Sequence, residues 1–456
     1  MPRSSRLAAT VLLCSGALGC ASTLDVKAAR RGGDAVTQWT LIADYYGRGA
    51  SNWRTLAIMQ TAMHDALNAA DPVDERWWPA EAGEPDAAGA DAEVAMVAAA
   101  NEVLLLLHPD RADETRAAFG GVLRRYPDGP GKNAGERLGT AIGRAAVGRR
   151  ARDGSENVRY FRGHEAPGRW RPTPPLLQTS RTNDSRPFLF SDASEVPTRP
   201  PPALGTPEYE RQVALTRRLG GTKSTERTRS QAEDAYFWAY QNSQRGFTNL
   251  AVRLVAAHPP PGGVHGEARI LAALSVALAD SAILSWTAKE RYAYWRPITA
   301  IRAEGDPEWT PLIDTPPFPE YPSGHASDCY VGSGVLEDAF PDLAGPIEYP
   351  SSAHLEPLSG EPEPPAPPES GGMGQHAQPV QRGADAPGGS SRTFPTFAAL
   401  AENCADSRVW AGAHFAAAGA ESKRIAVIIV HRAVSASAVR APALSELRPP
   451  ALEDGR

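Results

Sequence analysis

The chain has 456 residues, which is enough for two domain-sized cores. Its net charge is −6, because 47 Lys and Arg nearly balance 53 Asp and Glu. This balance gives no general positive field, so we expect no nucleic-acid partner, and any anion site must be local. The abundance of Pro (42) and Gly (41) predicts long irregular connections between ordered parts.

Residues 1–21 are typical of an export signal. Arg3 and Arg6 precede a short apolar run, and small residues follow it around Cys20. The run is too short to cross a bilayer as a mature helix. We therefore expect an exported protein, periplasmic or secreted, with lipid attachment at Cys20 as the alternative to simple cleavage. No later segment is expected to span a membrane.

Helical periodicity dominates the segments that follow. Apolar residues share one stripe of a helix over 53–68, and 91–107 and 135–152 are further helix candidates. These segments predict an amino-terminal helical bundle over 35–160. Residues 161–206 are rich in proline and predict an extended connection.

Helices return over 207–445, where we expect a second helical bundle. Its longest periodic run covers 268–293. Strand-like alternation of useful length is absent from the sequence, so the predicted fold is all-α, with two tandem helical bundles. Residues 345–391 are dense in Pro, Gly, Ser and Glu and predict a surface insertion in the second bundle, with a lid as the alternative.

Three segments of the second half combine cations, a hydroxyl and imidazoles. They are Lys289 with Arg296-Pro297, then Pro322-Ser323-Gly324-His325, then Ser407-Arg408 with His414. Three cations beside two imidazoles can hold a tetrahedral oxyanion and move protons around it. The combination therefore predicts an enzyme with an oxyanion pocket.

The spacings suggest how each segment would be placed. Lys289 and Arg296 are seven residues apart, which would put them on one face of a helix that Pro297 ends or kinks. A helical stretch follows His325, which would put Ser323 and the Gly324 amide at a helix amino terminus that favours an anion. For the third segment we expect Ser407-Arg408 in the turn before a helix and His414 in its first turns.

These segments resemble the signature of the type 2 phosphatidic acid phosphatase and vanadium haloperoxidase superfamily, in which Lys-x6-Arg-Pro, Pro-Ser-Gly-His and Ser-Arg-x5-His occur in that order. The resemblance implies catalytic roles for His325 and His414. It implies oxyanion binding by Lys289, Arg296, Ser323, Gly324 and Arg408.

Neighbouring residues favour the soluble vanadium chloroperoxidases and their bacterial relatives. Phe318-Pro-Glu-Tyr-Pro322, Trp286, 54–68 and 168–175 are similar to that branch. The resemblance implies two tandem four-helix bundles with the active site in the second, vanadate as cofactor with His414 as its axial ligand, and hydrogen peroxide and halide as substrates. Trp286 and Phe318 would line a halide pocket, although core aromatics explain them nearly as well.

Two other functions stay open. A soluble acid phosphatase would use the same pocket without a cofactor and hydrolyse phosphate monoesters through a phosphohistidine at His414. A non-catalytic descendant would only bind phosphate or a partner. The superfamily commonly has Asp four residues after the last His, and here that position is Ala418. The loss should weaken phosphatase turnover, whereas another group could still fix the tautomer of the imidazole.

Cys329 and Cys404 each lie close to a signature segment. In an oxidising compartment they could form a disulfide if the fold brings the two segments together. Two buried, unpaired cysteines are the alternative.

Overall fold

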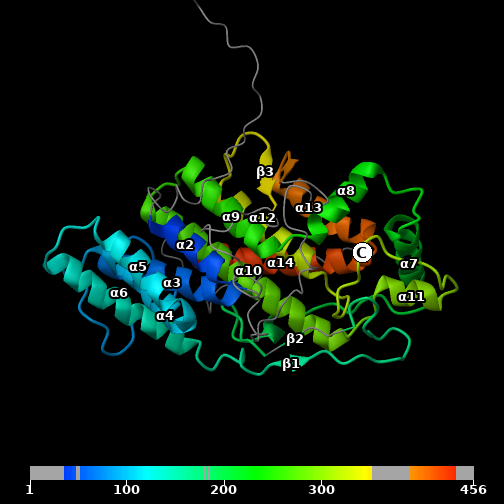
Figure 1. The fold of residues 1–456 in the computed structure, drawn as a ribbon, viewed down its shortest axis with the longest axis horizontal. Coiled ribbons are helices and arrows are strands. Elements are labelled where there is room, and N and C mark those ends of the chain that lie inside the picture. Colours follow the sequence, from blue (N-terminus) through cyan, green and yellow to red (C-terminus); the bar gives the residue numbers. More distant parts are fainter. Residues whose placement is uncertain (1–34, 48–51, 178–180, 183, 352–390, 438–456) are drawn as a thin grey trace, which may run out of the picture.

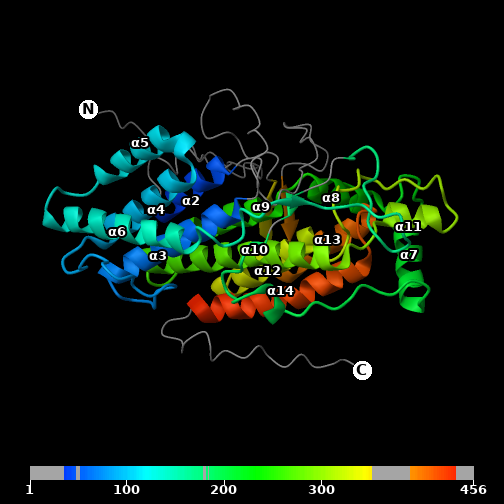
Figure 2. The same cartoon turned by 90° about the horizontal axis from the view of Figure 1, so that it is seen from below.

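The computed structural model describes residues 35–47, 52–177, 181–182, 184–351 and 391–437. The predicted export signal (1–21), Cys20 and residues 352–390 of the predicted insertion lie outside the described residues. Apart from two pairs of short strands, the described segments are helices and their connections (Figures 1 and 2). The all-α prediction is confirmed.

The amino-terminal helices lie together at one end of the molecule, in blue and cyan in Figure 1. They are α2 (Ala35–Tyr46), α3 (Trp53–Ala70), α4 (Ala92–Leu107), α5 (Ala112–Leu123) and α6 (Pro130–Arg149), with the 3-10 turn η1 (Pro109–Arg111) between α4 and α5. Helix α4 begins where Asp91 accepts a hydrogen bond from the Val94 amide, 3.0 Å away. Helix α6 approaches α4 so closely that a Cβ at Gly139 would lie 1.9 Å from the Ala95 carbonyl oxygen, so this contact requires glycine.

The proline-rich stretch runs along the molecule as an extended connection with little regular structure (Figure 1). It contains β1 (Arg159–Tyr160), antiparallel to β2 (Arg181–Thr182), and the 3-10 turn η2 (Ala193–Glu195). The buried Asp280 carboxylate attaches the connection to the second half by accepting the Phe188 and Leu189 amides at 2.7 and 2.8 Å.

The second half surrounds one long helix, α10 (Val264–Tyr292). Its other helices are α7 (Pro207–Gly220), α8 (Arg229–Ala239), α9 (Ser243–Ala257), α11 (Pro297–Ala303), α12 (Gly324–Ala339), α13 (Phe397–Trp410) and α14 (Ala416–Ser437). Helix α10 packs on α12 and α14 and also on α3, so one continuous apolar core joins the two halves.

The short antiparallel pair β3 (Ile347–Pro350) and β4 (Ser391–Phe394) closes the base of the predicted insertion. Pro350 pairs with Ser391, so the described residues that flank 352–390 are held side by side.

Among the described residues, α10 is long and apolar enough to cross a membrane, by length and composition alone. By this measure alone, the expectation that no later segment spans a membrane has only weak support. In α10, 94% of the most apolar 18-residue window is buried inside the protein, as in a core helix. Helix α4 with Pro109–Leu123 passes the test only as one span, and that pair is bent by 116°.

Candidate functional site

Lys289 and Arg296 come from different elements, so the prediction that they share one helix face is wrong. Helix α10 ends because Ala293 adopts a left-handed conformation, with φ of 42°, and its amide caps the Lys289 carbonyl at 2.9 Å. Arg296 is then the extended residue before α11, which Pro297 begins. Both side chains are buried, and they meet across this turn.

The Lys289 ammonium group holds the loop that precedes Ser323. Its Nζ donates to the carbonyl oxygens of Pro319 and Glu320, each at 3.0 Å, and to that of Pro322. An ammonium group has three N–H donors, and these bonds use them. Lys289 therefore fixes the loop and contributes to the site through its charge. Burial and the nearby Arg296 hold its pKa well below the usual 10.5.

The Arg296 guanidinium joins the first and third segments. Its Nε donates to the Phe318 carbonyl at 2.9 Å, and its Nη1 donates to the Ala413 carbonyl at 2.8 Å and to His414 Nε2 at 3.0 Å. Burial lowers the pKa of Arg296 to about 9, and the Glu320 carboxylate acts in the opposite direction.

Buried guanidinium donors are left without acceptors in the site. Nη2 of Arg296 and both Nε and Nη1 of Arg408 have no hydrogen-bond partner among the residues that the structure describes. Each such group typically costs roughly 1–3 kcal/mol, and more when it is charged. An oxyanion would supply the missing acceptors, so the residues present fit vanadate or phosphate.

The predicted helix amino terminus is present. Ser323 is the residue before α12, and its Oγ accepts the Ala326 amide at 3.4 Å. Gly324 is the first helical residue and His325 follows it. The dipole of this 16-residue helix adds to the field of the three cations.

His325 is buried beside the cations. Its Nε2 lies 3.3 Å from the Gln241 carbonyl oxygen, which requires a proton on Nε2 and leaves the lone pair on Nδ1. Burial and the charge of Arg408 lower its pKa well below the usual 6.5, so the ring is neutral at physiological pH.

The prediction for the third segment is wrong, because the helix carries Ser407 and Arg408 and the connection carries His414. Ser407 and Arg408 lie in the last turn of α13, and His414 lies in the connection before α14. A tight turn brings them together: the His414 amide donates to the Arg408 carbonyl at 3.1 Å. The turn needs glycine, because Gly412 has φ of 72° and a Cβ there would lie 2.5 Å from the Gly220 carbonyl oxygen.

His414 has a carboxylate partner that the sequence reasoning missed. Its Nδ1 lies 2.9 Å from Glu320 Oε1, and the Phe415 amide donates to the same oxygen at 3.0 Å. Burial raises the pKa of Glu320 to about 7, and burial together with Arg296 holds the pKa of His414 well below 6.5. An acidic residue in an otherwise apolar stretch directly before Pro322 was the available signal.

The two aromatic residues proposed for a halide pocket lie in contact. The ring centroids of Trp286 and Phe318 are 5.0 Å apart, and both side chains are buried. The Phe318 ring lies 5.2 Å from Lys289 Nζ and 4.8 Å from Arg296 Cζ. Phe318 therefore borders the cations, which a purely core position would not require.

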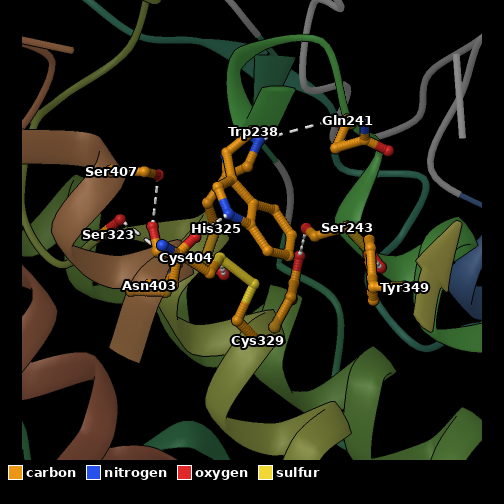
Figure 3. The surroundings of a disulfide bond; sticks show 12 residues. Trp238, Gln241, Ser243, Ser323, His325, Cys329, Tyr349, Asn403, Cys404 and Ser407 are labelled. Carbon is orange, nitrogen blue, oxygen red and sulfur yellow. Dashed lines mark hydrogen bonds between the residues drawn. A yellow bond between two sulfur atoms is a disulfide. The ribbon is translucent and has the colours of Figure 1, made fainter. Parts of the chain in front are cut away.

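Cys329 and Cys404 form a disulfide, so the open question of their pairing is settled in the structure. The bond joins α12 to α13, one helical turn from His325 on one side and from Ser407 on the other (Figure 3). The helices that carry His325 and Arg408 are therefore covalently linked.

Fold and site together define a helical-bundle protein in which three buried cations lie beside two buried or half-buried imidazoles. Residues 269–439 match the family described as the VCPO second helical-bundle domain, and these residues contain all three signature segments. The resemblance to the vanadium haloperoxidases is confirmed.

Individual relatives show the same resemblance. A vanadium chloroperoxidase from Curvularia inaequalis is 30% identical, over 30% of this chain and 29% of its own length. The chain thus matches less than a third of that relative. The crystal structure of a bacterial vanadium-dependent iodoperoxidase is similar with a TM-score of 0.68 at 21% identity, covering 90% of this chain and 97% of that one. An apo-type bacterial vanadium-dependent chloroperoxidase has a TM-score of 0.59 at 17% identity, covering 86% and 94%. At these identities, the structural likeness concerns the fold.

Proposed function

We propose that the protein is a vanadate-dependent haloperoxidase-like enzyme, an oxidoreductase that oxidises halide with hydrogen peroxide. The observation that carries this proposal is the set of buried guanidinium donors, on Arg296 and Arg408, that lack acceptors within the described chain. A vanadium chloroperoxidase and a bacterial vanadium-dependent iodoperoxidase among its relatives support the same chemistry.

Vanadate would be held by charge and by donors from three elements. Arg296 and Arg408 would donate to its oxygens, Lys289 would contribute charge, and Ser323 and the Gly324 amide would border it at the start of α12. His414 would help to hold it through Nε2. When bound, vanadate would supply the Lewis-acidic centre at which peroxide is activated.

The site carries a net positive charge that suits a multiply charged anion. The site contains three basic side chains and one acidic side chain, that of Glu320, whose pKa burial raises to about 7. The pKa values of both imidazoles lie well below 6.5. Basic groups therefore outnumber acidic ones, which suits an anion such as vanadate or phosphate. Burial of these charges makes each interaction stronger than it would be in water.

His325 would act as the general acid or base. Its Nε2 proton is directed to the Gln241 carbonyl, so Nδ1 holds the lone pair that can accept a proton from peroxide. A neutral ring is required for this step, and the lowered pKa of His325 keeps it neutral.

Halide would approach on the side of Trp286 and Phe318. These rings offer a largely apolar wall next to two cations, an environment that partly dehydrates a small anion while still attracting it. We propose this side of the pocket as the halide site.

A phosphatase is the second candidate, and Glu320 favours it. The sequence suggested that Ala418 removes the carboxylate that would strengthen His414 as a nucleophile. The structure supplies a carboxylate from Glu320, 2.9 Å from Nδ1. Without vanadate, the same site could bind a phosphate monoester, with His414 Nε2 attacking phosphorus. His325 would have to gain a proton on Nδ1 before it could protonate the leaving alcohol.

One assay separates these functions. The purified protein is incubated with orthovanadate and tested for halide-dependent consumption of hydrogen peroxide, and the vanadate-free protein is tested for hydrolysis of an aryl phosphate. Halide oxidation only after vanadate loading is the expected result. Aryl phosphate hydrolysis without halide oxidation would replace the proposal by the phosphatase, and inactivity in both assays would leave only the non-catalytic descendant.

We also propose that the protein is exported to the periplasm or secreted, with residues 1–21 as the signal. The Cys329–Cys404 disulfide supports this location, because disulfides persist in oxidising compartments. Cell fractionation followed by mass spectrometry of the mature amino terminus tests it and distinguishes simple cleavage from lipidation at Cys20. An uncleaved chain in the cytoplasm would contradict the proposal.

A further inference from the structure

We infer that Glu320 positions His414, and that it replaces from a different segment the carboxylate that this chain lacks at Ala418. The inference rests on the proposed oxyanion site. It assigns a role to a residue outside the three signature segments, and it explains how the chain functions with alanine at a position where a carboxylate is common.

One carboxylate oxygen fixes both the ring and the backbone of the histidine segment. Oε1 of Glu320 accepts from His414 Nδ1 at 2.9 Å and from the Phe415 amide at 3.0 Å. On the opposite side of the ring, Arg296 Nη1 donates to Nε2 at 3.0 Å. A donor at Nε2 and an acceptor at Nδ1 together select the tautomer that carries its proton on Nδ1. The Nε2 lone pair is thereby directed toward the cations.

The backbone of Glu320 is itself held in place. Its amide donates to the Tyr294 carbonyl at 3.0 Å, and its carbonyl accepts from Lys289 Nζ at 3.0 Å. Its side chain is fully buried. A carboxylate anchored in this way can orient a neighbouring ring, because its own position is determined by contacts made elsewhere.

Position 418 lies beside the same group of residues. Ala418 is fully buried, its amide donates to the Phe415 carbonyl at 3.1 Å, and its carbonyl accepts the Ser323 amide at 3.3 Å. An aspartate at 418 would therefore start from a backbone position next to the histidine segment. Glu320 thus supplies, from one segment, the carboxylate that an aspartate at position 418 would supply from another.

A simple affinity measurement would mix two opposite effects of removing Glu320. Loss of its negative charge makes the site more positive and strengthens binding of any oxyanion, whereas loss of ring orientation weakens only a ligand that bonds to Nε2. Phosphate remains four-coordinate when it binds, but vanadate readily accepts a fifth ligand. The ratio of the phosphate Kd to the vanadate Kd therefore isolates the contribution of His414.

The test measures this ratio by calorimetry, with micromolar orthovanadate and inorganic phosphate, in the full-length protein. We expect Glu320→Ala to lower the ratio by roughly tenfold to a hundredfold, the usual effect of removing a partner of a ligating histidine. Adding Ala418→Asp to Glu320→Ala should restore most of the ratio. Asp280→Asn is the matched control, since Asp280 is also a buried carboxylate that accepts two amides but lies on the Phe188 side of α10.

A parental ratio in Glu320→Ala, or no recovery in the double variant, would overturn the inference. If Glu320→Ala does not fold, nitrogen NMR of the wild-type protein labelled at histidine decides instead. His414 should appear as the tautomer protonated at Nδ1, and a proton on Nε2 would overturn the inference. Neither measurement involves halide, so a protein that binds vanadate but oxidises no halide would refute the proposed function and leave this inference testable.

Discussion

Nη1 of Arg296 lies 3.0 Å from Nε2 of His414 and donates to it, so the atom proposed to bond the anion is already in contact with one of the cations. An oxyanion that approaches the ring must therefore replace His414 Nε2 as the acceptor of the hydrogen bond from Arg296 Nη1. Nη2 of the same guanidinium lacks a partner in the described part of the chain and can bind the anion from the start. Arg296 can thus donate to the anion through Nη2 before the hydrogen bond from Nη1 to His414 breaks.

Replacing Arg408 by Ala should weaken binding of vanadate or phosphate by roughly 2–5 kcal/mol, as expected for the loss of one member of a buried charge pair. Calorimetric titration measures the effect. Arg392→Ala is the control, because Arg392 lies outside the three signature segments and pairs with Asp234. Parental affinity in Arg408→Ala would remove Arg408 from the site.

Lys289 and Arg408 should differ in their effect on stability. Lys289→Met leaves three buried carbonyl groups without their donor, so we expect weaker anion binding and a lower Tm. Arg408→Met removes a buried guanidinium with two nitrogens that lack acceptors within the described chain, so the Tm of the ligand-free protein should stay the same or rise. Thermal unfolding without added anion measures both. A fall in Tm for Arg408→Met as large as that for Lys289→Met would contradict this difference.

The pKa of His325 predicts a pH-dependent contribution to stability. Because this pKa is lower in the folded than in the unfolded protein, the unfolded state binds more protons below pH 6.5. The contribution is therefore fully present above pH 6.5 and is lost as the pH falls. The free energy of unfolding of the wild type, relative to His325→Asn, should decrease by up to about 1.4 kcal/mol per pH unit below that point. Urea titrations between pH 7 and pH 5 measure it, and a difference independent of pH would contradict the buried, neutral ring.

The two histidines should give different defects. His414→Ala should lose vanadate binding and peroxide turnover together, because it removes the imidazole proposed to hold vanadate. His325→Ala should retain vanadate but slow turnover by roughly a hundred- to ten-thousandfold, the usual contribution of a general acid or base. Parallel binding and turnover measurements distinguish the variants, and equal loss of vanadate in both would contradict the division of roles.

The segment 352–390 should be dispensable. The strands that flank it, β3 and β4, pair with each other, so a short Gly/Ser linker can connect Ser351 to Ser391 without moving either strand. Turnover and Tm of the shortened protein should equal those of the parent. A large loss of turnover with an unchanged Tm would instead support the alternative interpretation, in which the insertion acts as a lid.

The sequence was informative where a local pattern determines the structure. The apolar stripe over 53–68 and the helical periodicity over 91–107 predicted the two amino-terminal helices α3 and α4. The helical stretch after His325 predicted the start of α12 at Ser323. Residue types and their order along the chain were sufficient to name the cations and imidazoles of the pocket.

What the sequence could not show depends on contacts between distant segments. The end of α10 at Ala293 requires a left-handed alanine, which local propensity does not favour, and the extended connection packs there through the bond from the Trp170 amide to the Ala293 carbonyl. The contact between Glu320 and His414 joins residues 94 positions apart. The sequence showed both residues but not their proximity.

The Cys329–Cys404 bond also changes the connectivity of the molecule. It closes a covalent ring across 75 residues, and that ring contains the whole segment 352–390. A protease that cuts the chain once within the ring would yield two polypeptides, one ending after His325 and the other beginning before Arg408, that remain a single molecule until the disulfide is reduced. Such a nicked protein would migrate as one band without reductant and as two with it, and both halves of the anion pocket would stay attached to each other.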